Sequence, residues 1–345
     1  MAVIERHEPN TFCWPELSST DVAAAKAFYA GLFGWTLGDS PVAGGGTYTL
    51  CSLGGKNVAG LFAMRAEEKQ QGVPTHWSSY VSVTSVELMA DRAAFAGAKI
   101  VAPPFDVMDV GRMAVIQDPA GAMFSLWQPR IHIGAQRMRE PGAPSWFELM
   151  TTDIEAARRF YADVFGWRAA TDAGTGYTEF FLRDTPGGKA GRAIAGMLAR
   201  PAGMASIPPS WLVYFDVADV DAAAIVATKL GGRTVVPPRD IPRVGRFAVL
   251  MDSTGGGFAV LRLSARAAEA GKPGAAAAPS AVPSVAAKPP GARGKRPAAA
   301  TKRKPARAHK PAKKRAVRKA RPRGKARAKA KARPKAKPRR ARKRR

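Results

Sequence analysis

The stretch WPELSSTDVAAAKAFYAGLFGW at residues 14–35 returns, with substitutions, as WFELMTTDIEAARRFYADVFGW at residues 146–167. A second pair follows at nearly the same offset: VGRMAVIQDPAGAMFSL at 110–126 and VGRFAVLMDSTGGGFAV at 244–260. The offsets are 132 and 134 residues. A period of this length is too long for a solenoid repeat and matches the size of a whole domain. The sequence therefore predicts a duplicated domain.

Each copy begins with a short extended segment followed by an amphipathic helix. Apolar residues recur at helical spacing over 22–33 and 154–165. Thr152 with Glu155 offers a capping box as an alternative start for the second helix. The predicted N-caps and C-terminal glycines are Asp21 and Asp153, Gly34 and Gly166.

Further strand-like runs, an alanine-rich helix and a hairpin complete each copy. Pro-Pro pairs at 103–104 and 237–238 are expected to interrupt the chain before the hairpin. Each copy thus reads as βαβββ twice, so the prediction is an α+β protein with four such units. The predicted divisions are an arm at 1–9, domains at 10–130 and 144–264, a linker at 131–143 and a tail at 265–345.

The net charge of +29 belongs to the tail alone. Residues 265–345 contain 31 of the 55 Lys and Arg residues and a single acidic residue, Glu269, so residues 1–264 are nearly neutral. The tail has no aromatic residue and no Leu, Ile or Met. Such a segment buries too little apolar surface to offset an ordering entropy of roughly 1–2 kcal/mol per residue, so we expect it to be disordered.

Cysteine usage and the N-terminus indicate the compartment. Cys13 and Cys51 both fall in the first copy and have no counterpart in the second, so we expect reduced thiols. The first ten residues carry charges where a signal peptide is apolar, and no apolar run approaches the length of a membrane span. We expect a soluble, cytoplasmic protein.

The paired βαβββ units, the helix pattern D-x-x-x-A-x-x-F-Y-x-x-x-F-G-W and the V-G-R…D-P-x-G hairpin resemble the vicinal oxygen chelate superfamily. This superfamily includes glyoxalases, bleomycin-resistance proteins and extradiol dioxygenases. The resemblance covers residues 10–264 twice over and is greatest to two-domain glyoxalase-like bacterial proteins often described as hydroxylases. It implies tandem domains that pack as an intrachain pseudo-dimer, with either enzymatic or purely binding activity.

The resemblance also implies where a divalent metal would be held by His, Glu or Gln. The three ligand positions of the superfamily correspond to Trp14, Ser78 and Ser125 in the first copy, and to Trp146, Leu212 and Ala259 in the second. None of these side chains is a good metal ligand. We therefore expect no standard metal site and no cofactor.

A shifted site is the alternative. Glu16 and His76 each lie two residues from a lost ligand position, and period-2 geometry places them on the same face. Together they could hold a weakly bound divalent ion or act as an acid–base pair. His76 is matched by Ser210, however, and no third ligand is evident, so a hydrogen-bonded glutamate and a strand-end histidine are favoured.

Glu16 and Glu148 occupy the same place in both copies. An inward-facing carboxylate is costly unless it is paired or meets water or a ligand. It could accept a hydrogen bond from a ligand hydroxyl or amine, or act as a general base. The alternative is an ion pair with Arg112 or Arg246, two arginines that otherwise brace a turn or bind an anion.

Aromatic residues are expected to line the same faces, where they suit a flat or apolar small molecule. Core packing is the alternative for each of them, and it is the favoured interpretation for Trp77, Trp211, Phe28 and Phe160. The candidate ligand-binding residues are Trp14, Glu16, His76, Ser78, Tyr80, Ser125, Trp127, Trp146, Glu148 and Tyr214.

The tail resembles the C-terminal arm of linker histones and the Ala-Lys-Pro-rich extensions of some bacterial nucleoid proteins. Dense Lys and Arg residues release counterions from phosphates, which predicts non-specific binding of nucleic acid through residues 265–345. Without aromatic residues the tail has no platform for base stacking. A solubilising role or attraction to an anionic membrane surface is the alternative, without membrane insertion.

The leading hypothesis is a small-molecule-binding protein that lacks the standard metal ligands and is tethered to nucleic acid, hence nucleoid-associated. A second hypothesis is a metal-dependent lyase, hydroxylase or dioxygenase with an atypical site. In a third hypothesis the tail carries the main function. The protein is then a nucleoid-associated DNA-binding protein whose globular part is a spacer.

Overall fold

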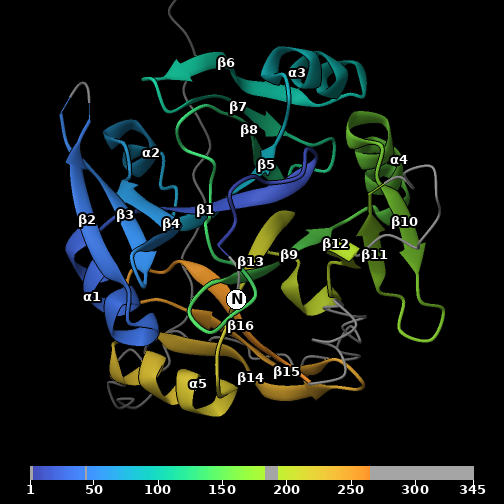
Figure 1. Cartoon of the computed structure of the whole chain (residues 1–345). Coiled ribbons are helices and arrows are strands. Elements are labelled where there is room, and N and C mark those ends of the chain that lie inside the picture. Colours follow the sequence, from blue (N-terminus) through green and yellow to red (C-terminus); the bar gives the residue numbers. More distant parts are fainter. Residues whose placement is uncertain (1–2, 43–44, 183–192, 265–345) are drawn as a thin grey trace, which may run out of the picture. The chain divides into compact units, whose positions relative to one another are not determined.

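The computed structural model describes residues 3–42, 45–182 and 193–264, and the predictions for the tail at 265–345 lie outside these residues. Each copy forms one eight-stranded mixed sheet (Figure 1). The prediction of an α+β fold with two tandem domains is confirmed. No helix in the described part of the chain is both long and apolar enough to cross a membrane.

The first sheet has the strand order β2-β3-β4-β1-β5-β8-β7-β6. Strand β1 pairs in parallel with β4 and antiparallel with β5, so it joins the two βαβββ units at the centre of the sheet. In sheet order the strands are β2 (Thr36–Pro41), β3 (Thr47–Leu53), β4 (Lys56–Ala63), β1 (Thr11–Ser19), β5 (His76–Ser82), β8 (Met123–Pro129), β7 (Gly111–Gln117) and β6 (Lys99–Val107).

The second sheet repeats this order, with β9 and β13 as its central antiparallel pair. In sheet order its strands are β10 (Arg168–Thr171), β11 (Thr178–Phe181), β12 (Ala193–Ala199), β9 (Pro144–Thr151), β13 (Ser210–Asp216), β16 (Gly257–Leu263), β15 (Gly245–Met251) and β14 (Arg233–Ile241). The predicted hairpins are therefore β7–β8 and β15–β16.

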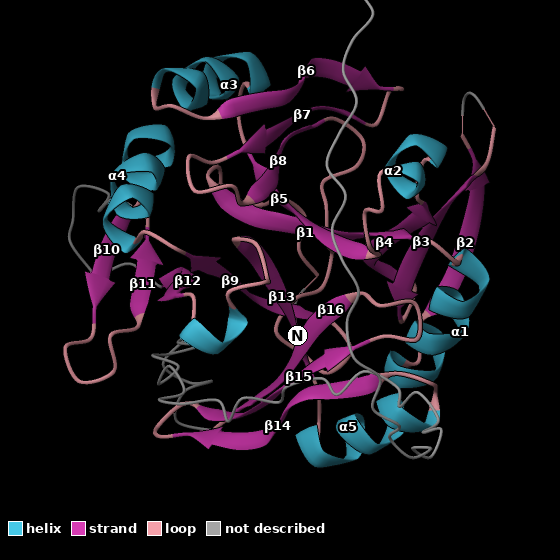
Figure 2. Cartoon of the chain, turned by 180° about the vertical axis from the view of Figure 1, so that it is seen from behind, coloured by secondary structure: helices cyan, strands magenta, loops and turns pink. Residues whose placement is uncertain are grey.

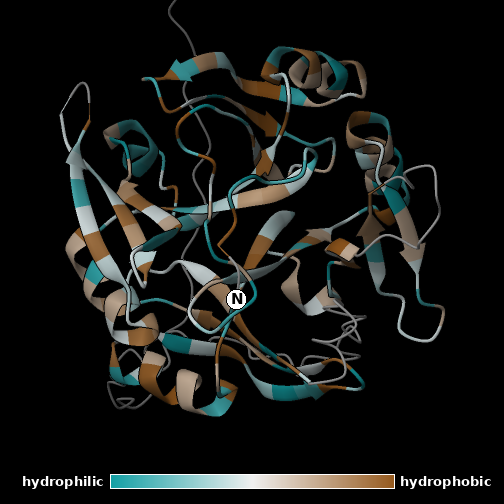
Figure 3. Ribbon diagram, viewed as in Figure 1, coloured by the Kyte–Doolittle hydropathy of each residue, from teal (hydrophilic) through white to brown (hydrophobic). Residues whose placement is uncertain are grey.

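The two long helices begin and end where the sequence predicts. The Asp21 side chain accepts from the N–H of Ala24 to cap α1 (Val22–Phe33), and Gly34 ends that helix with φ 70°. Asp153 caps α4 (Ile154–Phe165) in the same way, so the alternative start at Thr152 is wrong. The other helices are α2 (Ala66–Gln70), α3 (Val86–Phe95), α5 (Val220–Lys229) and the short 3-10 helix η1 (Ala202–Met204). Almost all of α2 is hydrophilic (Figure 3).

The Pro-Pro pairs do not interrupt the chain as predicted. Pro103 and Pro104 lie inside β6, where the register with β7 shifts between Ala102 and Phe105, and β14 shifts in the same way. Both strands are at the edge of their sheet, where a residue without an N–H removes no ladder bond on the open side. A bulge thus accommodates each pair.

The helices pack across the two copies. Helix α1 of the first copy lies beside α5 of the second, and α4 lies beside α3 (Figure 2). The Tyr29 hydroxyl donates to Asp252 Oδ2 at 2.8 Å and accepts from the Trp77 indole at 2.9 Å. The equivalent contact is made from the second copy to the first: the Tyr161 hydroxyl donates to Asp118 Oδ2 at 3.0 Å. The predicted pairing of the two domains is confirmed.

The tryptophans of the two F-G-W motifs also reach across. The indole of Trp35 donates to the carbonyl of Gly142 at 2.7 Å, and that of Trp167 donates to the carbonyl of Asn10 at 2.8 Å. Asn10 and Gly142 are equivalent positions, and both have a positive φ, 64° and 85°. The residues just before β1 and β9 therefore each hold the other copy's helix end.

One apolar core continues through both copies. Phe12 stacks on Phe147 with ring centroids 4.3 Å apart, and Phe33 packs against Phe215 at 5.0 Å. Trp77, Trp211, Phe28 and Phe160 all belong to this core, as predicted. The two cysteines form no disulfide, as predicted. Both are buried, and burial raises the pKa of both thiols.

Asp216 at the end of β13 gives the fold a pH dependence. Its carboxyl is buried, and its nearest cation, Arg262 Nη1, lies 3.7 Å away, beyond hydrogen-bond distance. Desolvation raises the pKa of Asp216 from its ordinary value of 3.8 to about 6, although Arg262 opposes the shift.

Between pH 3.8 and about 6 the unfolded chain loses this proton while the folded chain keeps it, so stability falls as the pH rises and then levels off. We expect this group to contribute a loss of roughly 2–3 kcal/mol over that window. Urea unfolding at several pH values would measure it. In Asp216→Asn the loss should shrink by that amount, and an unchanged pH profile would contradict the assignment.

Candidate functional site

Glu16 lies at the centre of a hydrogen-bonded group on β1. Its Oε1 accepts from the Tyr80 hydroxyl and its Oε2 from the Tyr48 hydroxyl, both at 2.6 Å. The indole of Trp14 donates to the Tyr48 hydroxyl at 3.1 Å. Strands β1, β3 and β5 thus each supply part of one group, which we call the first anchor: Trp14, Glu16, Tyr48 and Tyr80.

The second copy builds the same group from β9, β13 and the residue that precedes β11. Glu148 Oε1 accepts from the Tyr214 hydroxyl at 2.7 Å and Oε2 from the Tyr177 hydroxyl at 2.8 Å. The indole of Trp146 donates to Tyr177 at 3.0 Å. These four residues, Trp146, Glu148, Tyr177 and Tyr214, form the second anchor.

A glycine makes room for each anchor. Gly60 is the register partner of Glu16 and Gly196 that of Glu148. A Cβ atom at Gly60 would lie 2.0 Å from the Tyr48 hydroxyl oxygen, and one at Gly196 would lie 1.7 Å from that of Tyr177. The side-chain-free position lets each tyrosine cross the neighbouring strand to reach the carboxylate.

Burial dominates the electrostatics of both carboxyls. Desolvation raises the pKa of Glu16 and of Glu148, while the donated tyrosine hydrogen bonds lower it. Arg65 and His76 further lower the pKa of Glu16 by their charge. Each carboxylate oxygen has a second lone pair, so the group can still accept a hydrogen bond from a ligand hydroxyl or amine.

The other predicted site residues share the sheet face of the first anchor. Ser78 is the register partner of Glu16, and Ser125 that of Tyr80. The Trp127 ring lies 6.2 Å from that of Tyr80. The His76 ring nitrogen Nδ1 instead lies 2.9 Å from the Pro74 carbonyl. That these residues bind a ligand remains a prediction.

The residues present do not fit the metal of the superfamily. In the described part of the chain no group of three His, Cys, Asp or Glu side chains converges on one point. At the expected ligand position, the Trp14 indole nitrogen is a hydrogen-bond donor to Tyr48, and both Glu16 oxygens accept tyrosine hydroxyls. The side chains of the first anchor are therefore arranged as hydrogen-bonding groups and not as a set of metal ligands.

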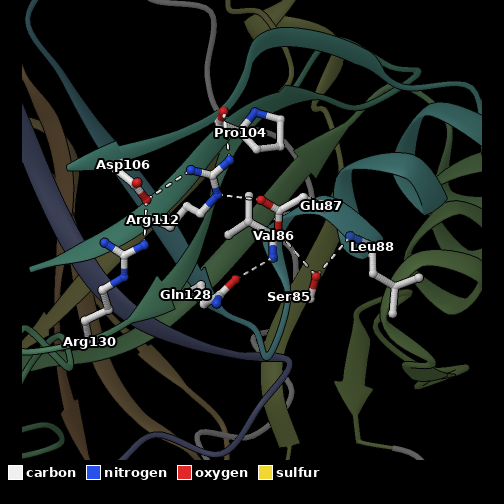
Figure 4. Close-up of polar contacts among 9 residues, drawn as sticks. All are labelled: Ser85, Val86, Glu87, Leu88, Pro104, Asp106, Arg112, Gln128 and Arg130. Carbon is white, nitrogen blue, oxygen red and sulfur yellow. Dashed lines mark hydrogen bonds and ion pairs between the residues drawn. The ribbon is translucent and has the colours of Figure 1, made fainter. Parts of the chain in front are cut away.

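The alternative ion pairs of the glutamates are wrong. Arg112 instead pairs with Glu87 at 2.5 Å and with Asp106 at 3.0 Å, and Asp106 also binds Arg130 (Figure 4). Arg246 pairs with Asp221 and Asp240 in the second copy. The arginines therefore brace the β6–β7 and β14–β15 hairpins and the helix that precedes each of them.

Tyr48 and Tyr177 are the functional candidates that the sequence analysis missed. They are separated by 129 residues, whereas the main repeat has an offset of 132, so aligning the two copies at that offset does not pair them. The signal that was available is the dipeptide Tyr-Thr at 48–49 and 177–178, in the strand-like run after the first helix of each copy.

Known proteins resemble the chain in sequence over both copies. A model of the Glyoxalase/Bleomycin resistance protein/Dioxygenase superfamily matches residues 12–126 and again residues 143–260. The chain is 40% identical over 251 residues to "Putative glyoxylase CFP32" of Mycobacterium tuberculosis, which covers 72% of this chain and 93% of that protein. It is 37% identical over 270 residues to the anthracycline biosynthesis protein DnrV of Streptomyces peucetius, covering 75% and 95%.

A solved structure supports the fold. The Mn(II)-bound glyoxalase from Novosphingobium aromaticivorans matches with a TM-score of 0.52 at 18% identity, over 74% of this chain and 82% of that one. At this identity the likeness concerns the fold alone.

Proposed function

The chain belongs to the Glyoxalase/Bleomycin resistance protein/Dioxygenase superfamily, and from this premise we propose that it is a small-molecule-binding protein whose two anchors each hold a ligand. The observation that carries the proposal is the Glu–Tyr–Tyr–Trp arrangement, which is present in both copies of the domain. The proposed ligand donates a hydroxyl or amine hydrogen to Glu16 or Glu148.

Each anchor residue has a distinct role in this proposal. The carboxylate receives the ligand's donor, and the two tyrosines fix its position and offset the cost of burying its charge. Trp14 and Trp146 orient a tyrosine through the indole N–H and present a ring to the ligand. An aromatic wall with one polar anchor is typical of sites for flat, hydroxylated molecules.

Two relatives in anthracycline biosynthesis, DnrV and DauV, are consistent with such a ligand. An anthracycline is a planar polycyclic compound that carries hydroxyl groups. We therefore include an anthracycline, simple phenols and hydroxy acids in the ligand panel below.

The experiment is a thermal-shift screen of the full chain followed by calorimetric titration of each hit. We expect the double variant Glu16→Gln, Glu148→Gln to bind about 10- to 100-fold more weakly, because a hydrogen bond to a charged group contributes about 1.5–3 kcal/mol. Glu87→Gln is the matched control, since it removes a half-exposed carboxylate that pairs with Arg112 and not with an anchor residue. Equal affinity of the wild type and the double variant would refute the proposal.

We also propose that residues 265–345 tether the protein non-specifically to nucleic acid, which would make it nucleoid-associated. The supporting observation is the concentration of 31 Lys and Arg residues in this segment. If the tail engages about ten phosphates, the logarithm of the binding constant should fall with that of salt concentration at a slope of roughly −9.

Titration of the full chain with a short DNA duplex at several salt concentrations would measure the slope. Replacing the ten Lys and Arg residues of 331–345 by Gln should weaken binding and make the slope shallower. Binding that does not respond to salt or to this replacement would count against the tether.

A further inference from the structure

The two anchors lie in different surroundings, although their own residues match. The strand registers show which positions of the two sheets are equivalent. Glu16 is paired with Ser78, and Glu148 is paired with Leu212. Tyr80 is paired with Ser125 where Tyr214 is paired with Ala259. Other exchanges on these faces are Ser18 to Met150, His76 to Ser210, Met113 to Phe247, Trp127 to Leu261 and Ser82 to Asp216.

We propose that the first anchor binds a hydroxyl-rich, sugar-like acid, whereas the second binds a flat, largely apolar molecule with a single hydroxyl. This inference rests on the proposed function and assigns a ligand class to each of its two sites. It follows from the serine-for-apolar exchanges, from unpartnered polar atoms beside the first anchor, and from the cationic side chain of Arg65.

Within the described ranges, two unpartnered polar atoms lie beside the first anchor, and in the second copy Asp216 Oδ1 is unpartnered as well. Ser18 is 2% exposed and its Oγ has no hydrogen-bond partner among the described residues, although it shares the sheet face of Glu16. The Nε2 atom of His132 is likewise buried without a partner. Buried polar atoms in native proteins are nearly always satisfied, so a ligand rich in oxygen atoms would complete both.

His132 also packs against two tryptophan rings on the side of the first anchor. Its ring lies 4.5 Å from that of Trp14 and 5.8 Å from that of Trp127. Burial lowers the pKa of His132 to about 4, so the imidazole is neutral near pH 7 and its Nε2 can donate or accept. Indole rings beside hydroxyl and carboxylate groups suit a sugar, whose C–H face stacks on a ring while its hydroxyls form hydrogen bonds.

A cationic side chain near Glu16 favours an acid group on that ligand. Arg65, which follows β4, lowers the pKa of Glu16 by its charge. Pro201 is the counterpart of Arg65. The residues before them, Arg200 and Met64, donate their backbone N–H groups to equivalent carbonyls, those of Thr151 and Ser19. Ser210 replaces His76, so the second anchor lacks both groups.

Apolar side chains pack around the second anchor, although the buried carboxyl of Asp216 lies on the same strand face. Trp146 and Tyr214 pack in one cluster with Phe247, Ala259 and Leu261, all of them buried. Glu148 is 5% exposed and takes its hydrogen bonds from the two tyrosines. A ligand there would bury ring surface against this cluster and use its single hydroxyl on Glu148.

The test uses calorimetric titration of the full chain with D-glucuronate and with 1-naphthol. Glu16→Gln and Ser78→Leu should weaken glucuronate binding about tenfold or more and leave naphthol binding unchanged, while Glu148→Gln and Leu212→Ser should do the reverse. Saturation with one probe should not change the dissociation constant of the other. Neutral glucose should bind more weakly than glucuronate at the first anchor.

The outcomes separate this inference from the function on which it depends. If the probes compete, or if each glutamate variant weakens both probes equally, the division of ligand classes is overturned and the binding function stands. If neither probe nor any other member of the ligand panel responds to either glutamate variant, both proposals fail. Thermal unfolding of each variant identifies any that lose binding because they do not fold.

Discussion

Asp118→Ala should lower the stability of the protein far more than replacement of an exposed carboxylate. Asp118 is buried, its Oδ1 accepts three backbone N–H groups of its own turn, and its Oδ2 accepts the Tyr161 hydroxyl from the other copy. Alanine removes the acceptor of all four hydrogen bonds, although the Gly121 N–H keeps its bond to the backbone carbonyl of residue 118. We expect a loss of about 3 kcal/mol in the free energy of unfolding, or a fall of roughly 6–12 °C in Tm, measured by calorimetry.

Asp106→Ala is the control for this prediction. Asp106 also accepts hydrogen bonds, from Arg112 and Arg130, but it is exposed and its ion pairs are screened by water. Its replacement should move Tm far less than that of Asp118. Equal effects of the two variants would show that the contact between the copies contributes little to stability.

Gly60→Ala should weaken binding strongly at the first anchor, and Gly196→Ala should do the same at the second. The new methyl group would occupy the path of Tyr48 or Tyr177, so the tyrosine must leave its carboxylate. Because each tyrosine both positions and stabilises that carboxylate, we expect ligand affinity at that anchor to fall more than tenfold. Titration of each variant with the ligand of each anchor measures the effect.

Gly38→Ala is the matched control, since it also places a methyl group on a strand of the first sheet. Its nearest heavy atom would be the Leu50 carbonyl oxygen at 3.9 Å, an ordinary contact. This variant should bind as the wild type does. If Gly60→Ala also kept wild-type affinity, the Tyr48–Glu16 contact would have no part in binding.

The sequence predicts the fold because the repeated motifs carry the contacts that build it. The Phe-Tyr pair of each helix, the Trp that follows it and the Asp of the hairpin turn recur in both copies, and the structure shows that they bond across the copies. Capping and helix ends are local effects and were predictable. The Pro-Pro pairs were not, since a bulge on an edge strand depends on the neighbouring strand.

The site was predictable in part, for a related reason. Strand alternation places Trp14, Glu16 and Tyr80 on one face, and the repeat marks Glu148 as equivalent to Glu16. Alternation does not reveal which side chain crosses a strand to reach a carboxylate. That step depends on Gly60, whose missing side chain leaves room for Tyr48. The expected partner Arg112 is instead held at the hairpin by Glu87 and Asp106.

The most direct test of the central claim is a crystal structure of the full chain with a bound ligand from the panel. The account predicts a ligand hydroxyl or amine about 2.7–3.0 Å from a carboxylate oxygen of Glu16 or Glu148, with both tyrosine hydrogen bonds retained. A ligand bound elsewhere, with both carboxylates in contact only with their tyrosines, would contradict it.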